Sequence, residues 1–244
     1  MKQELPHIRP LSERAILIEF EENIKEDILK IVLYHKNRIE NFYIKEKVEV
    51  TNTYNSLLII YIYNIEDVYS EIFALKALIS EANITNKLHN KLFNIPVCYD
   101  PEFGLDLVLI SKSKNLSVEE IISIHTTPVY TVYFIGFLPG FPYLGGLDER
   151  LYISRKNEPR LEVKKGAVGI GEKQTGIYPI SSPGGWQIIG NSPVDLFDKK
   201  VVPPCQIMPG DKVKFYAVSK AKYLEILEQK KRGKFQLKTF FYGS

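Results

Sequence analysis

The chain has 244 residues, of which 45% are hydrophobic and 25% charged, a composition typical of one large globular domain or two average ones. Its formal net charge of +3 is small and its lysines are spread along the chain, so nothing indicates nucleic-acid binding. The N-terminal residues lack the apolar core of a signal peptide, and no run is long enough to cross a membrane. We therefore expect a cytoplasmic protein.

The two cysteines, Cys98 and Cys205, lie far apart, and neither has a histidine or another cysteine nearby in the sequence. This spacing does not fit a zinc site, and structural disulfides are rare in the cytosol. We expect two buried thiols and no metal site.

Hydrophobic periodicity in the first part of the chain predicts alternating strands and helices. We expect strands over 14–20, 48–51, 57–63 and 91–97, and helices over 22–38 and 65–83. This β-α-β-β-α-β order is that of the split βαβ, or ferredoxin-like, unit. The Asp100-Pro101 pair favours a turn, so the predicted domains are 1–98 and 99–244.

After the predicted boundary the pattern changes. A short helix is expected over 104–112. Ser117-Val118-Glu119-Glu120 has the spacing of a capping box and predicts a helix ending near His125. A strand over 129–137 and many short apolar runs between Gly and Pro residues are typical of a β-barrel or sandwich. A late helix over 223–231 and a closing strand over 235–242 complete a mixed α+β chain.

Residues 136–146 are the most unusual stretch, because six of these eleven residues are Gly or Pro and the rest include Phe137, Phe141 and Tyr143. Such a composition argues against a regular helix or a central strand. The rings argue against a flexible linker. Two interpretations remain, a packed structural loop and the wall of a ligand site, and the loop by itself favours the first.

Two neighbouring features are open to two interpretations each. His125 at a helix end either neutralises the helix dipole or serves as a general base, and the capping role is favoured for an isolated histidine. The glycine-rich stretch 166–176 is either a hairpin with tight turns or an anion-binding loop to which Lys173 and Thr175 add donors. It matches neither a Walker loop nor a dinucleotide-binding fingerprint.

Two further features lie close by in the sequence. Gly184 and Gly185 precede Trp186, the only tryptophan, which either anchors the core or lies against a flat ligand. Arg155 and Arg160 each offer a planar guanidinium suited to carboxylate or phosphate, although a solvated loop charge is the usual explanation. The features fall within one stretch of the chain, which strengthens the case for a site.

Taken in order, these segments resemble the KipI/PxpB family, whose members include the B component of 5-oxoprolinase and allophanate hydrolase subunit 1. The resemblance covers nearly the whole chain and is most specific in the second half. It rests on Arg9-Pro10-Leu11, 14–20, His125-Thr126-Thr127-Pro128-Val129-Tyr130, the 136–146 loop, Pro159-Arg160, 166–171, 174–179, 182–190 and Pro209-Gly210-Asp211.

The resemblance implies a small N-terminal α/β domain followed by a cyclophilin-like β-barrel. It also implies one component of an ATP-dependent 5-oxoprolinase, which converts 5-oxo-L-proline to L-glutamate together with a KipA/PxpC-like partner and a LamB/YcsF-like partner. ATP, with Mg²⁺, is then expected to be shared with the KipA/PxpC-like partner, so that the chain alone is inactive.

The same resemblance suggests roles for individual residues. His125 is the expected base or proton shuttle, Gln174 and Thr175 are expected donors to an oxyanion or phosphate, and Arg160 is expected to hold a carboxylate. The remaining expected substrate-binding residues are Phe137, Pro139, Gly140, Phe141, Tyr143, Gly176, Tyr178, Ser182, Gly184, Gly185 and Trp186.

The family history leaves two alternatives. One is an inhibitor that binds a sporulation or sensor histidine kinase, for which an apolar surface patch would be expected. The other is a carboxyltransferase that acts on urea-like amides, which would need a biotin carrier that this chain does not contain.

Overall fold

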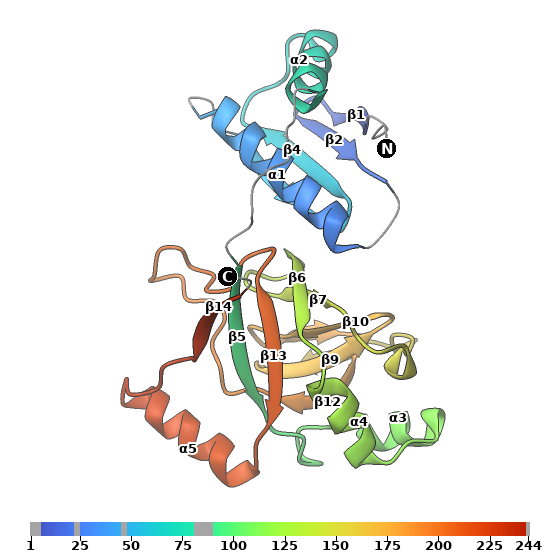
Figure 1. Cartoon of the computed structure of the whole chain (residues 1–244), viewed down its shortest axis with the longest axis vertical. Coiled ribbons are helices and arrows are strands. Elements are labelled where there is room, and N and C mark those ends of the chain that lie inside the picture. The colour runs from blue at the N-terminus through green and yellow to red at the C-terminus, as the bar shows by residue number, and fades with distance from the viewer. Residues whose placement is uncertain (1–5, 22–24, 45–47, 81–89, 243–244) are drawn as a thin grey trace. The chain divides into compact units, whose positions relative to one another are not determined.

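The computed structural model describes residues 6–21, 25–44, 48–80 and 90–242. The chain divides into two compact units, Met1–Leu88 and His89–Ser244 (Figure 1). Each unit contains its own sheet and its own hydrophobic core. No helix within the described ranges is long and apolar enough to cross a membrane.

The first unit is an antiparallel four-stranded sheet with strand order β1-β2-β4-β3 and two helices. Its elements are β1 (His7–Ser12), β2 (Ala15–Glu19), α1 (Glu26–Phe42), β3 (Val48–Asn52), β4 (Ser56–Tyr61) and α2 (Val68–Ser80).

Both helices of this unit pack against the same face of the sheet. Side chains alternate between the two faces of a strand, so the register that pairs Ile16 with Ile59 and Ile18 with Leu57 places all four side chains together. All four are fully buried, with Val32 of α1 and other apolar side chains of both helices completing the core.

The order of the first unit differs from the predicted β-α-β-β-α-β. The strand expected over 91–97 is present, but it belongs to the second unit, so the division precedes this strand instead of following it. The edge strand β1 was not predicted because only Ile8 is buried in it and Pro10 interrupts it, as is typical of an edge strand. Residues 22–24 and 81–83 of the predicted helices lie outside the described residues.

The second unit is built on an eight-stranded sheet with order β12-β9-β10-β7-β6-β13-β5-β14 and a separate β11-β8 pair. Its elements are β5 (Asn90–Val97), α3 (Leu107–Lys114), α4 (Val118–Thr126), β6 (Tyr130–Ile135), β7 (Pro142–Gly145), the 3₁₀ turn η1 (Glu149–Leu151), β8 (Arg160–Val163), β9 (Ala167–Gly171), β10 (Gln174–Ile177), β11 (Ser182–Gly184), β12 (Gln187–Asn191), β13 (Lys212–Ala217), α5 (Lys220–Lys231) and β14 (Thr239–Tyr242).

Long-range pairing holds this sheet together. The strand β5 pairs in parallel with β13 and antiparallel with β14, both near the C-terminal end of the chain. A bridge between Cys98 and Asn191, formed by two backbone hydrogen bonds of 2.9 Å, joins the end of β5 to β12. Burial raises the pKa of the Cys98 thiol and of the half-buried Cys205 thiol, and neither forms a disulfide.

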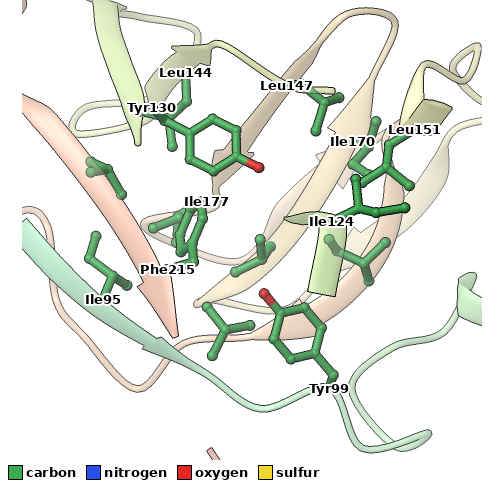
Figure 2. Close-up of a cluster of buried hydrophobic side chains, with 14 of the residues drawn as sticks. Ile95, Tyr99, Ile124, Tyr130, Leu144, Leu147, Leu151, Ile170, Ile177 and Phe215 are labelled. Carbon is green, nitrogen blue, oxygen red and sulfur yellow. The ribbon is translucent and has the colours of Figure 1, made fainter. Parts of the chain in front are cut away.

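The core of the second unit is aliphatic with tyrosines at its centre. Figure 2 shows the rings of Tyr99 and Tyr130 among side chains such as Ile177, Leu144 and Phe215, which come from strands far apart in the sequence. The hydroxyl of Tyr130 donates to the carbonyl of His125 over 2.7 Å, so this buried polar group is satisfied.

The prediction that residues 136–146 contain no central strand was wrong. The strand β7 lies between β6 and β10 in the middle of the sheet. Pro142 is its first residue, where the missing amide is tolerated. Gly145 is required because a Cβ there would lie 2.3 Å from the Tyr133 ring. Gly145, the last residue of β7, therefore allows close packing against a neighbouring ring.

Two other local predictions can be compared with the structure, one for residues 166–176 and one for the start of α4. Residues 166–176, open to two interpretations from the sequence, contain the β9–β10 hairpin, in which Gly171 pairs with Gln174 across the turn at Glu172 and Lys173. The predicted capping box is confirmed: the Ser117 hydroxyl accepts from the Glu120 amide, and the Glu120 carboxylate accepts from the Ser117 amide.

Candidate functional site

A cavity of about 270 Å³ in the second unit is walled mainly by aromatic rings, and we call it the aromatic pocket. It brings together the 136–146 loop, the segment after η1 and the stretch between β10 and β12, which includes β11. Its lining consists of Phe137, Phe141, Tyr143, Arg155, Pro159, Tyr178, Pro183, Gly184, Gly185 and Trp186.

Phe141 organises the rings of this pocket. It is almost fully buried and meets Tyr178 edge-on at 5.0 Å and Trp186 edge-on at 5.3 Å between ring centroids. Edge-to-face contacts of this kind stabilise aromatic clusters beyond the area that they bury. Phe137 is 64% exposed and has a φ of 63°, which places its ring at the rim of the pocket. The inner walls are therefore fixed, while the rim is open to solvent.

Glycines allow the rings to come this close to the backbone. A Cβ on Gly171 would lie 2.6 Å from two atoms of the Trp186 indole, and a Cβ on Gly184 would lie 2.4 Å from the Tyr178 hydroxyl. A Cβ on Gly176 would lie 2.7 Å from the Pro142 carbonyl oxygen and 3.0 Å from the Phe141 ring. Real Cβ atoms do not approach other atoms so closely, so any larger residue would displace a ring that lines the pocket.

Among the described residues that line the aromatic pocket, Arg155 is the only cationic one. Its guanidinium carbon lies 5.9 Å from the centroid of the Trp186 ring, within the range of a cation–π contact. Within the described residues, no hydrogen bond or ion pair engages this guanidinium, so its donors are available to an anion.

Arg160, which was expected to hold a carboxylate of the substrate, is paired with a carboxylate of the chain itself. Its guanidinium donates to Asp106 Oδ1 over 2.7 Å, and Lys156 Nζ lies 3.7 Å from the same oxygen. The Asp106 side chain is only 4% exposed, and its other oxygen accepts from the Ile188 amide over 2.6 Å. Asp106 therefore joins the segment after η1 to the start of β12.

His125 lies in the core of the second unit and does not line the aromatic pocket. Its Nδ1 is 2.8 Å from the Tyr99 hydroxyl, and its Nε2 is 2.9 Å from Thr175 Oγ1. Because Thr175 donates its own proton to the Gly169 carbonyl over 3.0 Å, it accepts from Nε2–H, and Nδ1 accepts from Tyr99. Burial lowers the pKa of His125 to about 3, so the ring is neutral near pH 7.

The structure thus separates the predicted site residues into two groups. Phe137, Phe141, Tyr143, Tyr178, Gly184, Gly185 and Trp186 line the aromatic pocket, and Gly176 supports it from behind. His125 and Thr175 belong to the buried network, and Gln174 lies at the β9–β10 turn. Their catalytic roles remain predictions that the geometry of this pocket does not support.

The other predicted residues lie around the pocket. Pro139 is exposed, and the buried Gly140 approaches Phe197, with a Cβ position 2.5 Å from that side chain. The Ser182 hydroxyl donates to the Pro183 carbonyl. Sequence reasoning missed Asp106, because nothing local marks a buried carboxylate that pairs with residues far along the chain.

No group of three or more His, Cys, Asp or Glu side chains is arranged to hold a metal ion in the part of the chain that the structure describes.

Comparison with known proteins places the chain in a family. Residues 6–207 match the family described as carboxyltransferase domain, subdomain C and D. The chain is 39% identical over 226 residues to the B component of the 5-oxoprolinase of Bacillus subtilis, covering 88% of this chain and 94% of that protein.

Solved structures extend the comparison. A protein designated TTHA0988 superposes on this chain with a TM-score of 0.72 and 31% identity. The match covers 84% of this chain and 40% of TTHA0988. The urea amidolyase of Kluyveromyces lactis superposes on this chain with a TM-score of 0.83 at 23% identity. The match covers 99% of this chain and 17% of the urea amidolyase, and it shows that the two share a fold.

These comparisons place the chain in the class of mixed α+β, carboxyltransferase-like proteins with several sheets. The chain belongs to the carboxyltransferase domain family, subdomain C and D, and within it to the KipI/PxpB branch that includes the B component of 5-oxoprolinase. The resemblance found in the sequence is confirmed.

Proposed function

We propose that this chain is the B component of an ATP-dependent 5-oxoprolinase that converts 5-oxo-L-proline to L-glutamate. It acts with homologues of the other two components, one KipA/PxpC-like and one LamB/YcsF-like. The observation that carries the proposal is a small aromatic pocket in a chain related along nearly its whole length to the Bacillus subtilis 5-oxoprolinase component.

The size and walls of the aromatic pocket suit this substrate. Its volume of about 270 Å³ is below the roughly 300 to 1,000 Å³ of sites for drug-sized ligands. A five-membered lactam is small and nearly flat, so one of its faces would pack against the aromatic lining of the pocket. In this arrangement the chain's own residues bind and orient the ring and exclude water from one side of it.

The chemistry of ring opening explains the need for a nucleotide and for partners. Hydrolysis of the lactam is uphill near neutrality unless ATP, with Mg²⁺, activates the amide. The sequence contains no Walker loop, so we expect the nucleotide site to be shared with the KipA/PxpC-like partner. Binding of the substrate ring is the part of the reaction that this chain's geometry supports.

We also propose that the second unit has the cyclophilin-like β-barrel arrangement implied by the resemblance. The support is the Cys98–Asn191 bridge, which connects β5 near one end of the strand order to β12 at the other. The four-stranded first unit keeps the alternation of strands and helices expected of a ferredoxin-like domain, with β1 as an additional edge strand.

Reconstitution tests the function directly. The chain is purified with its KipA/PxpC-like and LamB/YcsF-like partners, and ATP hydrolysis and glutamate formation are measured with and without 5-oxo-L-proline. We expect hydrolysis only when the lactam and all three components are present. A Trp186→Leu variant should lose this activity, whereas Val202→Ala, at a residue that is 94% exposed and outside the pocket, should retain it.

Two additional measurements separate the alternatives. Urea in place of 5-oxo-L-proline, with a carboxylated biotin carrier added, tests the carboxyltransferase alternative. Autophosphorylation of a sensor histidine kinase, measured with and without added chain, tests the inhibitory alternative. If ATP hydrolysis by the complex did not depend on 5-oxo-L-proline, the proposed function would be wrong. Activity with urea would replace it by the carboxyltransferase function, and reduced kinase autophosphorylation would replace it by the inhibitory function.

A further inference from the structure

We propose that Arg155 binds the carboxylate of a small, cyclic, singly charged acid in the aromatic pocket, and that Asp106 is the positioning residue that makes this possible. The inference rests on the proposed function and refines it, because it moves the carboxylate-binding role from Arg160 to Arg155 and defines the class of ligand.

The first step concerns which cation is available. Of the cationic residues on the segment after η1, Lys156 and Arg160 both lie within ion-pair distance of Asp106. Arg155 lines the pocket over the Trp186 ring and has no such partner within the described residues. A guanidinium that is unpaired beside an apolar surface is well suited to bind a carboxylate with two parallel hydrogen bonds.

The second step concerns what holds Arg155 in place. The buried Asp106 side chain binds Arg160 through one oxygen and the Ile188 amide through the other. Its own amide donates to the Ile188 carbonyl over 2.8 Å. A further bond of 2.7 Å joins the Lys156 amide to the Gly185 carbonyl. The segment that carries Arg155 is thereby fixed to the strand that follows Trp186, which sets the distance between guanidinium and indole.

The third step concerns charge inside the pocket. None of the described residues that line it carries a carboxylate, so a ligand's ammonium group would find no partner there. 5-Oxo-L-proline satisfies this condition because its nitrogen is an uncharged lactam nitrogen. L-Proline has the same ring size but a charged nitrogen, and L-glutamate is charged at three groups. The pocket should therefore favour the lactam acid over both, which would also assist release of the product.

Ligand binding to the isolated full-length chain tests the inference. Because Trp186 is the only tryptophan, its fluorescence reports occupancy of the pocket, and calorimetry provides a second measurement. The probes are 5-oxo-L-proline, tetrahydrofuran-2-carboxylate, L-proline and 2-pyrrolidinone, which has the lactam ring without the carboxylate. We expect the two singly charged acids to bind at least about tenfold more tightly than 2-pyrrolidinone.

Substitution of the arginine should remove this preference. In Arg155→Met, the affinity for 5-oxo-L-proline should fall to that for 2-pyrrolidinone, while the affinity for 2-pyrrolidinone should stay unchanged. Arg155→Lys should retain part of the preference. The matched control is Lys173→Met, since Lys173 also lies 5.9 Å over an aromatic ring, that of Tyr152, but outside the pocket lining.

A double-mutant cycle tests the role of Asp106. Asp106→Asn should weaken binding of 5-oxo-L-proline more than binding of 2-pyrrolidinone, and it should have no further effect when combined with Arg155→Met. If Asp106 only maintained the fold, both ligands would lose affinity equally and the two substitutions would be additive.

The outcomes distinguish this inference from the proposed function. Arg155-dependent binding of cyclic acids by a chain whose complex does not hydrolyse ATP would overturn the proposed function and leave the inference standing. Unchanged binding of 5-oxo-L-proline by Arg155→Met, or binding of none of the probes by the wild-type chain, would overturn the inference while leaving an active complex explained by other residues.

Discussion

The Trp186 indole can occupy its position because Gly171 has no side chain. The Cβ of an alanine there would lie 2.6 Å from indole atoms Cε2 and Nε1, so the ring, which lines the aromatic pocket, would have to move. Overpacking of this kind typically costs about 1 to 3 kcal/mol. We predict that Gly171→Ala lowers the free energy of unfolding by an amount in this range and reduces ligand binding, as measured by urea unfolding and calorimetry.

Gly185→Ala provides the matched control for stability. Its Cβ would have no neighbour closer than 3.7 Å, an ordinary contact distance, although the residue lies in the same pocket. The free energy of unfolding of this variant should remain close to that of the wild type. Equal losses in the two variants would show that crowding of the indole is not the cause.

Single residues also show why the sequence could not select between the two arginines. Arg155 and Arg160 belong to the same short segment and have the same chemistry. The difference between them is Asp106, which is separated from Arg160 by 54 positions in the chain. Only the folded arrangement places that carboxylate beside Arg160 and leaves the Arg155 guanidinium to the pocket.

At the scale of single elements, α4 depends on its N-terminal cap. This helix is short and carries His125 into the core, and the Ser117–Glu120 capping box satisfies two of its free amide groups. We predict that Ser117→Ala lowers the free energy of unfolding by about 1 kcal/mol, measured by urea unfolding followed through Trp186 fluorescence.

Ser123→Ala in the same helix serves as the control. Ser123 is exposed in the middle of α4, and its replacement by a better helix former should leave stability unchanged or slightly raised. A loss of stability as large as that in Ser117→Ala would contradict the capping explanation.

Elements with strong local signals were predictable, and those that depend on distant partners were not. Amphipathic spacing and the capping box located the helices, and apolar runs located strands such as β4 and β13. The short pair β8 and β11 has exposed, mixed side chains, and its strands are stabilised by each other rather than by a local pattern. The grouping of aromatic residues into one pocket was predicted in outline, whereas the burial of His125 was not.

At the scale of the whole molecule, each unit contains a histidine that is neutral because it is buried. Burial lowers the pKa of His125 to about 3, and burial together with the nearby Arg38 lowers that of His35 to about 4. Both are near 6.5 in an unfolded chain. Between these values the unfolded chain binds more protons than the folded one, so stability is complete above pH 6.5 and falls as the pH is lowered.

We therefore predict that the second unit loses about 2 kcal/mol of stability between pH 7 and pH 5 through His125 alone. Urea unfolding followed through Trp186 fluorescence measures this unit, because the tryptophan belongs to it. His125→Gln, which cannot titrate, should be less stable at pH 7 but should lose much less stability at pH 5. The same dependence on pH in both proteins would contradict the assignment.

The parallel pairing of β5 with β13 has a consequence for synthesis of the protein on the ribosome. The first unit has all of its strands once residue 61 has emerged, and its second helix is complete at residue 80. The second unit begins with β5, whose neighbours in the sheet are β13 and β14. A nascent chain must therefore keep β5 without its sheet neighbours until translation is nearly finished. A stop codon before β13 should for this reason leave β5, the first strand of the unit, without either of its neighbours in the sheet.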